Sequence, residues 1–433
     1  MTIHMITLGC KVNQYESQAI CAMMEQCGFT AQDTPEGADV IILNSCTVTG
    51  TSDQKVRQTL RRARRRTPDA VLVLTGCMPQ AFPEESAKLL GDADIIVGNT
   101  NRHAIPALVL QFMHDRAPIL QIEPHQAGAP FESLRVHDFH DRTRAFVKIE
   151  DGCNRFCAYC IIPYARGRVR SKPLDELRAE LAQIAASGYR EVVLVGINLS
   201  AYGQDIGLQL SDAVDAAAAT DIARIRLGSL EPDRMTDALL DRLAKEPKFC
   251  PQFHLSMQSG CTETLRRMNR HYTAPEYAEI VRNIRAHFPR SSITTDWMVG
   301  FAGETDAEFE ASMRFVESVA FAKVHVFPYS QRPGTVADRL PDQVPPEVKE
   351  SRAHRALALA DRLHRAFLES QVGRTVEVLL EKSTDGRFTG FTPDYAPVRV
   401  RSDAALHNEI RSVRVTHADG EACMGILTDE YRI

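Results

Sequence analysis

Short apolar runs alternate with amphipathic stretches along the first part of the chain. The apolar runs lie at residues 3–8, 40–43, 71–75 and 95–97. Stretches with the spacing of an amphipathic helix lie at residues 13–26, 52–66, 79–90 and 105–112. Strands that alternate with helices in this way are typical of a parallel sheet with covering helices. The pattern predicts a three-layer α/β domain, which we assign to residues 1–125.

Six further apolar runs follow, with helical stretches between them. The runs lie at residues 145–150, 191–196, 224–229, 252–257, 292–299 and 322–327. The helical stretches include residues 174–186, 235–245, 275–287 and 306–318. Six such units favour an open, partial (β/α)6 barrel of parallel strands, with its site at the C-terminal ends of the strands. We assign this domain to residues 139–370, and it ends in a helix from about residue 347 that a Pro-rich segment precedes.

The tail from residue 371 alternates apolar and polar positions. The alternating runs lie at residues 375–380, 398–402 and 410–416, with turn residues between them. This pattern predicts a small antiparallel β-barrel over residues 371–433. The tail carries eight Lys and Arg against ten Asp and Glu. RNA binding there would therefore require a cluster on one side, formed by Arg387, Arg399, Arg401, Arg411 and Arg414.

The overall composition is that of an ordinary globular protein. Of 433 residues, 44% are hydrophobic and 25% are charged, and 51 basic against 56 acidic residues give a net charge of −5. No global basic field is present, so a nucleic-acid partner would have to be bound by local patches. The apolar runs fall short of the ~20 residues that a membrane-spanning helix needs. The first residues lack the pattern of a signal peptide, so we predict a cytoplasmic protein without a membrane partner.

Cysteine placement gives the strongest chemical signal. The odd total of 11 cysteines, without an export signal, argues against a disulfide framework. Cys153, Cys157 and Cys160 form a CxxxCxxC run, and three thiolates this close can hold three irons of a 4Fe–4S cluster while the fourth iron stays open. A structural zinc site is the alternative, but it needs four ligands and no fourth Cys or His lies nearby.

A second set of cysteines follows three of the predicted N-terminal strands. Cys10 follows the first strand, Cys46 the second and Cys77 the third. Because parallel strands bring their C-terminal ends to one edge of a sheet, the three should converge and hold a second 4Fe–4S cluster. The alternative is three buried small residues at strand ends. The five other cysteines are predicted to be core residues: Cys21, Cys27, Cys250, Cys261 and Cys423.

The CxxxCxxC run, with Tyr159 before its last cysteine, resembles the radical S-adenosylmethionine (SAM) superfamily. The resemblance implies that the open iron chelates SAM, which is then cleaved to a 5′-deoxyadenosyl radical. It also implies SAM contacts at positions in order along the predicted strands: Tyr159, Gly196, Asn198, Glu231, Ser256, Gln258, Val299 and Gly300. A glycine after a strand is by itself more often a turn residue, and only the order of these positions favours the cofactor role.

Four longer strings resemble the methylthiotransferases of this superfamily. They are LGCKVNQYES (8–17), LNSCTVT (43–49), TGCMPQ (75–80) and DGCNRFCAYCIIP (151–163). The form CKVNQYES most resembles the MtaB-type branch, which acts at carbon 2 of N6-threonylcarbamoyladenosine, at position 37 next to the tRNA anticodon. Branches that act on isopentenyl-adenosine in tRNA or on a ribosomal-protein side chain are the alternatives. A non-catalytic RNA-binding metal scaffold is the alternative from another class of protein.

The resemblance also implies cofactors and partners. They are two 4Fe–4S clusters, SAM as both methyl donor and radical source, the tRNA anticodon stem-loop, an electron donor such as flavodoxin or ferredoxin, and a TRAM-like tail. The sulfur donor stays open.

Two groups of cations are candidates for RNA binding. Residues 55–66 carry seven cations and no acid, among them Arg57, Arg61, Arg62, Arg64 and Arg65. Such a helix favours a phosphate-binding face, and a merely solvated helix is the alternative. A second group lies just beyond the CxxxCxxC run: Arg166, Arg168, Arg170 and Lys172. Two isolated residues have other predicted roles, since His254 should be a core or hydrogen-bonded histidine and Arg332 either an anion contact or a solvated loop residue.

Overall fold

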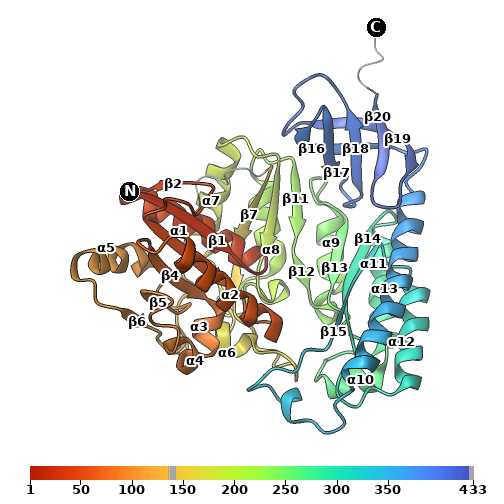
Figure 1. Ribbon diagram of the computed structural model, residues 1–433. Helices are drawn as coiled ribbons and strands as arrows, with labels where there is room; N and C mark the ends of the chain where they lie inside the picture. Colours follow the sequence, from red (N-terminus) through yellow and green to blue (C-terminus); the bar gives the residue numbers. More distant parts are fainter. Residues whose placement is uncertain (135, 137–142, 429–433) are drawn as a thin grey trace.

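The computed structural model describes residues 1–134, 136 and 143–428. The start of the predicted barrel domain at residue 139 and the last five residues of the predicted tail lie outside that part. Three folded regions follow one another along the chain: an N-terminal sheet with helices, a half-open barrel, and a small closed barrel at the C-terminal end (Figure 1). No helix in the described part is long and apolar enough to cross a membrane.

The N-terminal region is a six-stranded parallel sheet in the order β2-β1-β3-β4-β5-β6. Its strands are β1 (Thr2–Thr7), β2 (Thr30–Ala31), β3 (Val40–Ser45), β4 (Val71–Gly76), β5 (Ile95–Val97) and β6 (Ile119–Gln121). Its helices are α1 (Lys11–Gln26), α2 (Gly50–Arg66), α3 (Cys77–Ala81), α4 (Pro83–Ala87) and α5 (Ile105–Asp115).

Alternate side chains of the central strand β3 enter two different cores. Val40 and Ile42 pack with residues of α1 and α5, whereas Ile41 and Leu43 pack with residues of α2. The sheet is therefore covered by helices on both faces, and the predicted three-layer α/β arrangement is confirmed. One predicted helix, at residues 79–90, is instead split into α3 and α4, because Pro83 cannot continue a helix but fits the first turn of a new one.

The central region holds six parallel strand positions in sequence order. They are β7 (Arg144–Lys148), β10 (Glu191–Val195), β11 (Arg224–Leu227) with β12 (Ser229–Leu230), β13 (Gln252–Leu255), β14 (Ser292–Val299) and β15 (Lys323–Pro328). Gly228 separates β11 from β12, so the strands form one three-stranded and one four-stranded sheet. The edge strands β7 and β15 do not pair with one another, and the predicted partial (β/α)6 barrel is confirmed with an open side.

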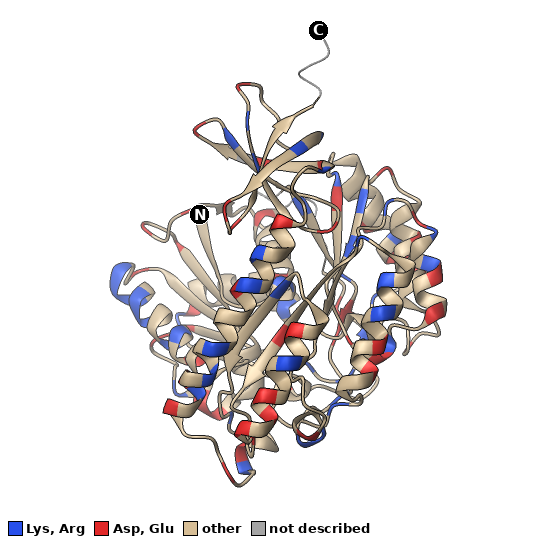
Figure 2. Cartoon of the chain, turned by 90° about the vertical axis from the view of Figure 1, so that its right-hand side faces the viewer, with Lys and Arg blue, Asp and Glu red and all other residues tan. Residues whose placement is uncertain are grey.

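Helices cover the outside of this barrel. The longer ones are α7 (Leu174–Ala186), α8 (Leu210–Ala218), α9 (Asp237–Ala244), α11 (Ala274–His287), α12 (Asp306–Val319) and α13 (Pro346–Glu369), and the shorter α10 spans Thr262–Arg267. Figure 2 shows acidic and basic residues interspersed along these outer helices, as expected of a solvated surface. After β7 the chain forms a small hairpin of β8 (Glu150–Asp151) and β9 (Arg170–Ser171), with the short helix α6 (Ile162–Arg166) between them.

The C-terminal region is a closed barrel in the order β16-β17-β18-β20-β19. Its strands are β16 (Thr375–Thr384), β17 (Arg387–Phe391), β18 (Pro397–Arg401), β19 (Ile410–Ala418) and β20 (Cys423–Leu427). Four of its pairings are antiparallel, as predicted, but β18 and β20 run parallel. Strands β17 and β20 were not predicted from the sequence.

The small barrel docks on the N-terminal ends of the central strands. Arg224 Nη1 donates to the carbonyl of Phe391 at 2.9 Å, Arg226 Nη1 donates to that of Pro393 at 2.9 Å, and Ser292 Oγ donates to that of Asp394 at 2.6 Å. The C-terminal barrel therefore lies at the end of the central barrel opposite to the one where the strands end and the site is expected.

Candidate active site

The three N-terminal cysteines lie at one edge of the sheet, in loops after neighbouring strands. Cys10 follows β1, Cys46 follows β3 and Cys77 follows β4, and these three strands are adjacent and parallel. A Cβ atom placed on Gly9, whose φ is +134°, would lie 3.1 Å from the Cβ of Cys46. The predicted convergence of the three loops is therefore observed, and Gly9 allows the close approach.

Asn13 holds two of these loops together. Its Oδ1 accepts a hydrogen bond from Cys10 Sγ at 3.3 Å, and its Nδ2 donates to Asn44 Oδ1 at 3.2 Å and to the carbonyl of Ser45 at 3.1 Å. Burial, and then the neighbouring Cys77, raise the pKa of the Cys46 thiol to about 12. The Cys46 thiol therefore resists ionisation on its own, and a bound metal would supply the positive charge that makes it a thiolate.

The second cysteine set lies in the loop between β8 and α6. The Cys160 N–H donates to the carbonyl of Cys157 at 2.9 Å, and the Arg155 N–H donates to Cys153 Sγ at 3.4 Å. Burial is the main reason that the pKa of Cys153 is raised to about 12, and the neighbouring Cys157 adds to it. Gly152 has φ +89°, and a Cβ there would lie 2.0 Å from the Arg168 carbonyl, so only glycine lets this loop approach the backbone of residues 167–168.

The donor chemistry of the two cysteine sets can be compared with that of known kinds of metal site. Among residues 1–134, 136 and 143–428, no three Cys, His, Asp or Glu side chains form a group that could hold a single metal ion. A 4Fe–4S cluster binds each cysteine through a different iron, so it fits thiols that are spread over neighbouring loops. The donor chemistry of both sets, three cysteines and no nearby histidine ligand, also fits a cluster with one open iron.

Each cysteine set receives a hydrogen bond from a buried arginine. Arg166 Nε donates to Cys77 Sγ at 3.2 Å, and Arg270 Nη1 donates to Cys157 Sγ at 3.2 Å. Arg270 Nη2 also lies 2.6 Å from Glu231 Oε2. The guanidinium of Arg270 therefore connects Glu231, a predicted SAM contact, with Cys157 of the CxxxCxxC run. Sequence reasoning missed Arg270, because no local motif marks it.

Arg166 belongs to a buried ionic network that joins the two domains. Its Nη1 lies 2.5 Å from Glu16 Oε1 and 3.3 Å from Asp151 Oδ1. Glu16 on α1 also pairs with Lys148 at 2.8 Å and with Arg102 at 2.9 Å. Burial opposes ionisation of Glu16, but Arg102, then Arg166 and Lys148, outweigh it and lower its pKa to about 2.

This burial corrects one predicted role. Arg166 has no exposed surface, so the prediction that it contacts RNA is wrong. Lys172, in the same sequence group, is also buried and pairs with Glu180. Arg168 is exposed and Arg170 is partly exposed, so their RNA contacts stay predictions.

A second connection between the domains involves Arg332. This residue is 3% exposed, and its Nη2 lies 2.6 Å from Asp53 Oδ2 on α2 and also donates to the Thr47 hydroxyl, next to Cys46. Arg332 is therefore not a solvated loop residue, and the anionic group that it contacts is the carboxylate of Asp53 in the N-terminal domain. Together with the Glu16 network, it fixes the N-terminal cysteine loops against the central barrel.

The residues predicted to contact SAM lie at the C-terminal ends of the barrel strands. Asn198 follows β10, Glu231 follows β12, Ser256 and Gln258 follow β13, and Gly300 follows β14. Figure 1 places these strand ends at the same end of the molecule as α3 and α6. Helix α3 begins at Cys77 of the first cysteine set, and α6 begins two residues after Cys160 of the second. The arrangement supports the predicted SAM positions, whose contacts stay predictions.

Three buried polar atoms in this region have no hydrogen-bond partner among the described residues: Asn198 Oδ1, Gln258 Oε1 and Glu150 Oε1. Glu150 lies at the start of the CxxxCxxC loop, and its Oε2 accepts the Asn198 N–H at 2.7 Å. Burial raises the pKa of Glu150 well above its usual range. Because buried polar groups are normally paired, these atoms fit a polar ligand such as the amino acid portion of SAM.

The other residues predicted to contact SAM are closely packed against their protein neighbours. A Cβ on Gly196 would lie 2.7 Å from Glu150 Oε2, and a Cβ on Gly300, whose φ is +70°, would lie 2.5 Å from Lys349 Cγ. Val299 is fully buried, and the ring of Tyr159 packs edge-on against Phe301 with centroids 6.4 Å apart.

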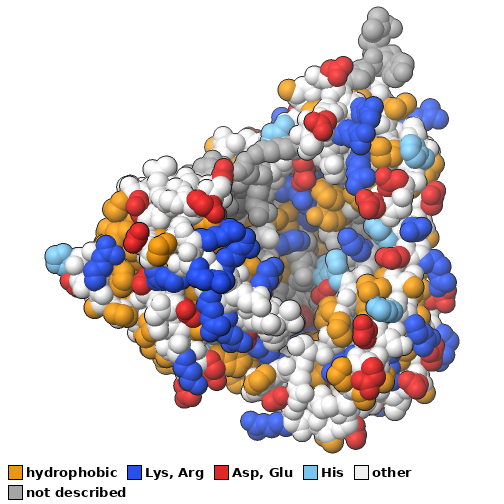
Figure 3. Space-filling model, viewed as in Figure 1, with side chains coloured by type: hydrophobic (Ala, Val, Ile, Leu, Met, Phe, Trp, Pro, Cys, Tyr) orange, Lys and Arg blue, Asp and Glu red, His pale blue; other side chains and the backbone are white. Residues whose placement is uncertain are grey.

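The basic helix α2 presents its cations on the outside. Its buried residues are Asp53, Val56, Leu60 and Ala63, and its arginines are exposed or partly exposed. Three of them find acidic partners on neighbouring elements: Arg61 with Asp92, Arg64 with Asp94, and Arg66 with Glu36. Figure 3 shows basic side chains gathered over this part of the N-terminal domain, beside a hollow in the surface. The RNA contacts of Arg57, Arg61, Arg62, Arg64 and Arg65 stay predictions.

The remaining predictions for single residues are mostly confirmed. Cys250, Cys261 and Cys423 are buried, but Cys27 is exposed at the end of α1 and Cys21 is partly exposed, so the core prediction is wrong for Cys27. His254 is hydrogen-bonded, as predicted, to the hydroxyl of Thr294 at 3.0 Å.

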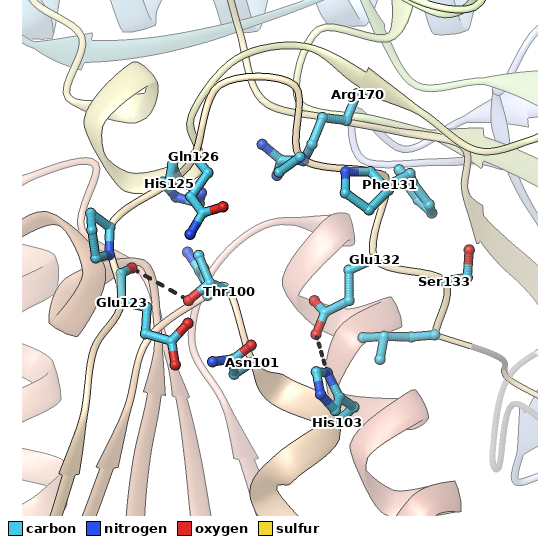
Figure 4. Close-up of a pocket in the computed structure, with 15 residues that line it drawn as sticks. Thr100, Asn101, His103, Glu123, His125, Gln126, Phe131, Glu132, Ser133 and Arg170 are labelled. Carbon is cyan, nitrogen blue, oxygen red and sulfur yellow. Dashed lines mark hydrogen bonds and ion pairs between the residues drawn. The ribbon is translucent and has the colours of Figure 1, made fainter.

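A cavity of about 440 Å³ lies at the junction of the N-terminal domain with the hairpin (Figure 4). Residues 99–101 after β5, the segment 123–134 and Arg170 line it. Figure 4 shows Glu132 directed at His103, and polar groups converging from both sides. None of the six candidate cluster cysteines is among its lining residues in the described part of the chain.

The fold and the two cysteine sets define a radical SAM enzyme with an additional N-terminal α/β domain. Residues 147–316 match the radical SAM superfamily, and residues 2–98 match the family described as uncharacterized protein family UPF0004. Two solved structures share the fold at low identity. The radical SAM methyltransferase TsrM from Kitasatospora setae has TM-score 0.57 and 13% identity over 90% of this chain and 80% of that one. The cobalamin-dependent radical enzyme OxsB has TM-score 0.52 and 11% identity over 83% and 56%.

Curated relatives match almost the whole chain. The threonylcarbamoyladenosine tRNA methylthiotransferase MtaB of Bacillus subtilis is 36% identical over 96% of this chain and 94% of its own length. The tRNA-2-methylthio-N(6)-dimethylallyladenosine synthase of Pelotomaculum thermopropionicum is 35% identical over 98% and 97%. The chain belongs to the radical SAM tRNA methylthiotransferase family, and it carries the SAM-dependent, iron–sulfur type of site that this family implies.

Proposed function

We propose that this chain converts N6-threonylcarbamoyladenosine, at position 37 next to the tRNA anticodon, to its 2-methylthio derivative. The observation that carries the proposal is the hydrogen bond from Arg166, at the end of the helix α6 that follows Cys160, to the sulfur of Cys77 in the other cysteine set. Sulfur insertion and methyl transfer at one carbon require both sites near one substrate, and this bond supports their juxtaposition.

The two cysteine sets would have different roles in the reaction. Cys153, Cys157 and Cys160 would hold the 4Fe–4S cluster that, with SAM, supplies the radical chemistry. Asn198 and Gln258 would orient the cofactor through their buried, unpartnered oxygens. Cys10, Cys46 and Cys77 would hold a second 4Fe–4S cluster, beside which the sulfur to be transferred is bound.

The substrate would reach the site through the open side of the barrel. Basic side chains of α2 lie beside the hollow there, where they would contact phosphates of the anticodon stem-loop (Figure 3). A flavodoxin or ferredoxin would deliver the electron, and we expect the protein to work in the cytoplasm, where its tRNA is found.

Nucleoside mass spectrometry and metal analysis test the proposal together. In a strain lacking the gene, 2-methylthio-N6-threonylcarbamoyladenosine should disappear from tRNA and its precursor should accumulate. The purified protein, reconstituted without oxygen, should contain roughly eight irons, and Cys77→Ala and Cys153→Ala should each contain roughly four. Both variants should fail to restore the modified nucleoside.

Cys27→Ala is the matched control, because Cys27 is exposed and lies at the opposite end of α1 from Cys10. It should keep the full iron content and restore the nucleoside. The proposal fails if the nucleoside persists in the deletion strain, or if Cys77→Ala keeps both the iron and the activity.

A dimethylallyl-adenosine substrate is the second candidate. The chain is 36% identical to a relative of the first kind and 35% identical to one of the second, so identity does not separate them. The same mass spectrometry decides, because the two methylthio nucleosides differ in mass.

A further inference from the structure

Polar side chains line the inside of the barrel below the predicted SAM positions. Along β13, β14 and β15 the residues that face the helices are buried and mostly apolar, such as Phe253, Leu255 and Trp297, with Thr295 as a polar exception. The residues that alternate with them face the lumen, because a strand places successive side chains on opposite faces. At this level of the three strands the lumen-facing positions are all polar: Gln252, His254, Thr294, Asp296, Lys323 and His325.

Four of these side chains form a connected group. His254 Nδ1 lies 3.0 Å from Thr294 Oγ1, and His254 Nε2 lies 3.2 Å from Asp296 Oδ2. Asp296 and His325 are register partners on β14 and β15, and the rings of His254 and His325 have centroids 5.9 Å apart. The Asp296 side chain is 31% exposed, so it is open to a ligand although it is bonded to His254.

Lys11 faces the same space from the N-terminal domain. It directly follows Cys10, and its charge lowers the pKa of His325, after burial, His254 and Lys323. Burial, and then Arg144 and Arg226, lower the pKa of Lys11 itself. Figure 3 shows the hollow between the N-terminal domain and the β14–β15 side, with histidine side chains on its wall.

The charges in this group select a type of ligand. Lys11 and Lys323 bring two positive charges to this group, against the carboxylate of Asp296, which is bonded to His254. The other carboxylate that acts on Lys11, that of Glu191, is paired with Arg226. An anionic group is therefore favoured near the lysines, and Asp296 and the histidines can bind a hydroxyl or an N–H. An apolar group would displace water from the exposed part of Asp296 and from the lysines without replacing the lost hydrogen bonds, which is unfavourable.

We propose that Lys11, His254, Asp296 and His325 recognise the N6 substituent of the target adenosine, and that this substituent carries a carboxylate and a hydroxyl. The threonylcarbamoyl group has both, whereas the dimethylallyl group is a hydrocarbon. The inference rests on the proposed function and deepens it, because it assigns the choice between the two candidate nucleosides to named residues. Two members of the group adjoin the predicted machinery in the chain, since Lys11 directly follows Cys10 and His254 lies two residues before Ser256, a predicted SAM contact.

Binding measurements on the reconstituted full-length protein test this site. Three anticodon stem-loop RNAs are compared that differ only at position 37, carrying N6-threonylcarbamoyladenosine, N6-dimethylallyladenosine or adenosine. The wild-type protein should bind the threonylcarbamoyl RNA at least tenfold more tightly than the other two. Lys11→Met and His325→Leu should lose most of this preference and keep the affinity for the adenosine RNA, because phosphate contacts are unchanged.

Two controls separate recognition from damage. Lys245→Met and His354→Leu, at exposed positions of the central domain, should keep the full preference. Iron content is measured for every variant, because Lys11 adjoins a cluster cysteine; if Lys11→Met loses iron, His325→Leu decides alone. In turnover, His325→Leu should raise KM for the threonylcarbamoyl RNA more than it lowers kcat.

The outcomes distinguish this inference from the proposed function. If His325→Leu loses the same affinity for all three RNAs, the proposed recognition site is wrong. It is also wrong if the wild-type protein binds the threonylcarbamoyl RNA and the dimethylallyl RNA equally tightly. If the dimethylallyl RNA alone is methylthiolated, the recognition site is wrong and the methylthiotransferase class stands. If the preference is found but none of the RNAs is methylthiolated, the recognition site stands and the proposed function is wrong.

Discussion

Arg166 donates its Nε–H to the sulfur of Cys77 across 3.2 Å, while its Nη1 lies 2.5 Å from the Glu16 carboxylate. One buried guanidinium thus connects a cysteine of the N-terminal sheet, the helix α1 that follows Cys10, and the helix α6 that follows Cys160. Any movement of the N-terminal domain against the barrel would break this bond and expose unpaired charges. The two candidate cluster sites are therefore held in one fixed arrangement.

The Arg166 bond should set the reduction potential of the proposed second cluster. Hydrogen bonds to cluster sulfurs and nearby positive charge favour the reduced state. In a Cys153→Ala background, which leaves only the N-terminal cluster, Arg166→Gln should lower the midpoint potential measured by a redox titration followed by electron paramagnetic resonance. Arg270→Gln is the matched control, since Arg270 donates to Cys157 in the other set and should leave this potential unchanged. An unchanged potential in Arg166→Gln with full iron content would contradict the prediction.

Glu16 should contribute strongly to stability at neutral pH. Its carboxylate is shared by Arg102, Lys148 and Arg166, and removing one partner of a buried ion pair typically costs about 3–5 kcal/mol. Glu16→Gln should lower the urea midpoint of the apo protein at pH 7. Glu279→Gln, at an exposed position on α11, should not.

The pKa of the Glu16 carboxylate determines how its contribution to stability depends on pH. Its pKa in the folded protein is lowered to about 2 from an ordinary value of 4.5. Its contribution is therefore fully present above pH 4.5 and is lost as the pH falls toward 2. The difference in midpoint between wild type and Glu16→Gln should shrink over that range, and a difference that stays constant down to about pH 2.5 would show that Glu16 is not the group responsible.

Much of the fold and of the cysteine chemistry could be predicted because both depend on local signals. Strand and helix periodicity gave the three regions, and the positions of Cys10, Cys46 and Cys77 after predicted strands gave their convergence. Two strands of the small barrel were missed because each contains a glycine that weakens its pattern. A Cβ on Gly390 would lie 2.3 Å from the Leu379 carbonyl, and one on Gly425 would lie 2.3 Å from Val413 Cγ1.

The ionic network could not be predicted, because its pairs join residues far apart in sequence. Glu16 and Arg166 are 150 positions apart. A run of arginines after the CxxxCxxC loop looks the same in sequence whether a member is exposed, like Arg168, or buried, like Arg166. One signal was present, since Glu16 lies on the same buried stripe of α1 as Val12 and Ala19, where a charge requires a partner.

The cations of α2 that lack an acidic partner should control the salt dependence of tRNA binding. Arg57, Arg62 and Arg65 take part in none of the ion pairs found within the described residues, unlike Arg61 and Arg64. Replacing the three by Gln should reduce the slope of log affinity against log salt by roughly two to three, because each phosphate that is neutralised adds about 0.7–0.9 to that slope. Filter binding over a salt series measures this.

Replacement of three exposed arginines on the mixed-charge outer helices, Arg282, Arg314 and Arg365, is the matched control. It removes the same formal charge from a surface where acids are interspersed (Figure 2). If both triple variants change the slope equally, only net charge matters and α2 is not an RNA-binding face.

Asn198 should be needed for SAM binding in the absence of RNA. Its Oδ1 is buried without a partner among the described residues, and its N–H is held by Glu150 at 2.7 Å, so the side chain is preorganised for a ligand. Loss of a hydrogen bond to a charged group costs about 1.5–3 kcal/mol, so Asn198→Ala should raise the Kd for SAM roughly 10- to 150-fold, measured by equilibrium dialysis with the reconstituted protein. Asn283→Ala, on the outer helix α11, should leave it unchanged. Asn198 Nδ2 also lies 3.7 Å from Cys153 Sγ, so the iron content of the two variants must be equal for the Kd values to be compared. An unchanged Kd for SAM in Asn198→Ala at equal iron content would show that Asn198 does not contact the cofactor.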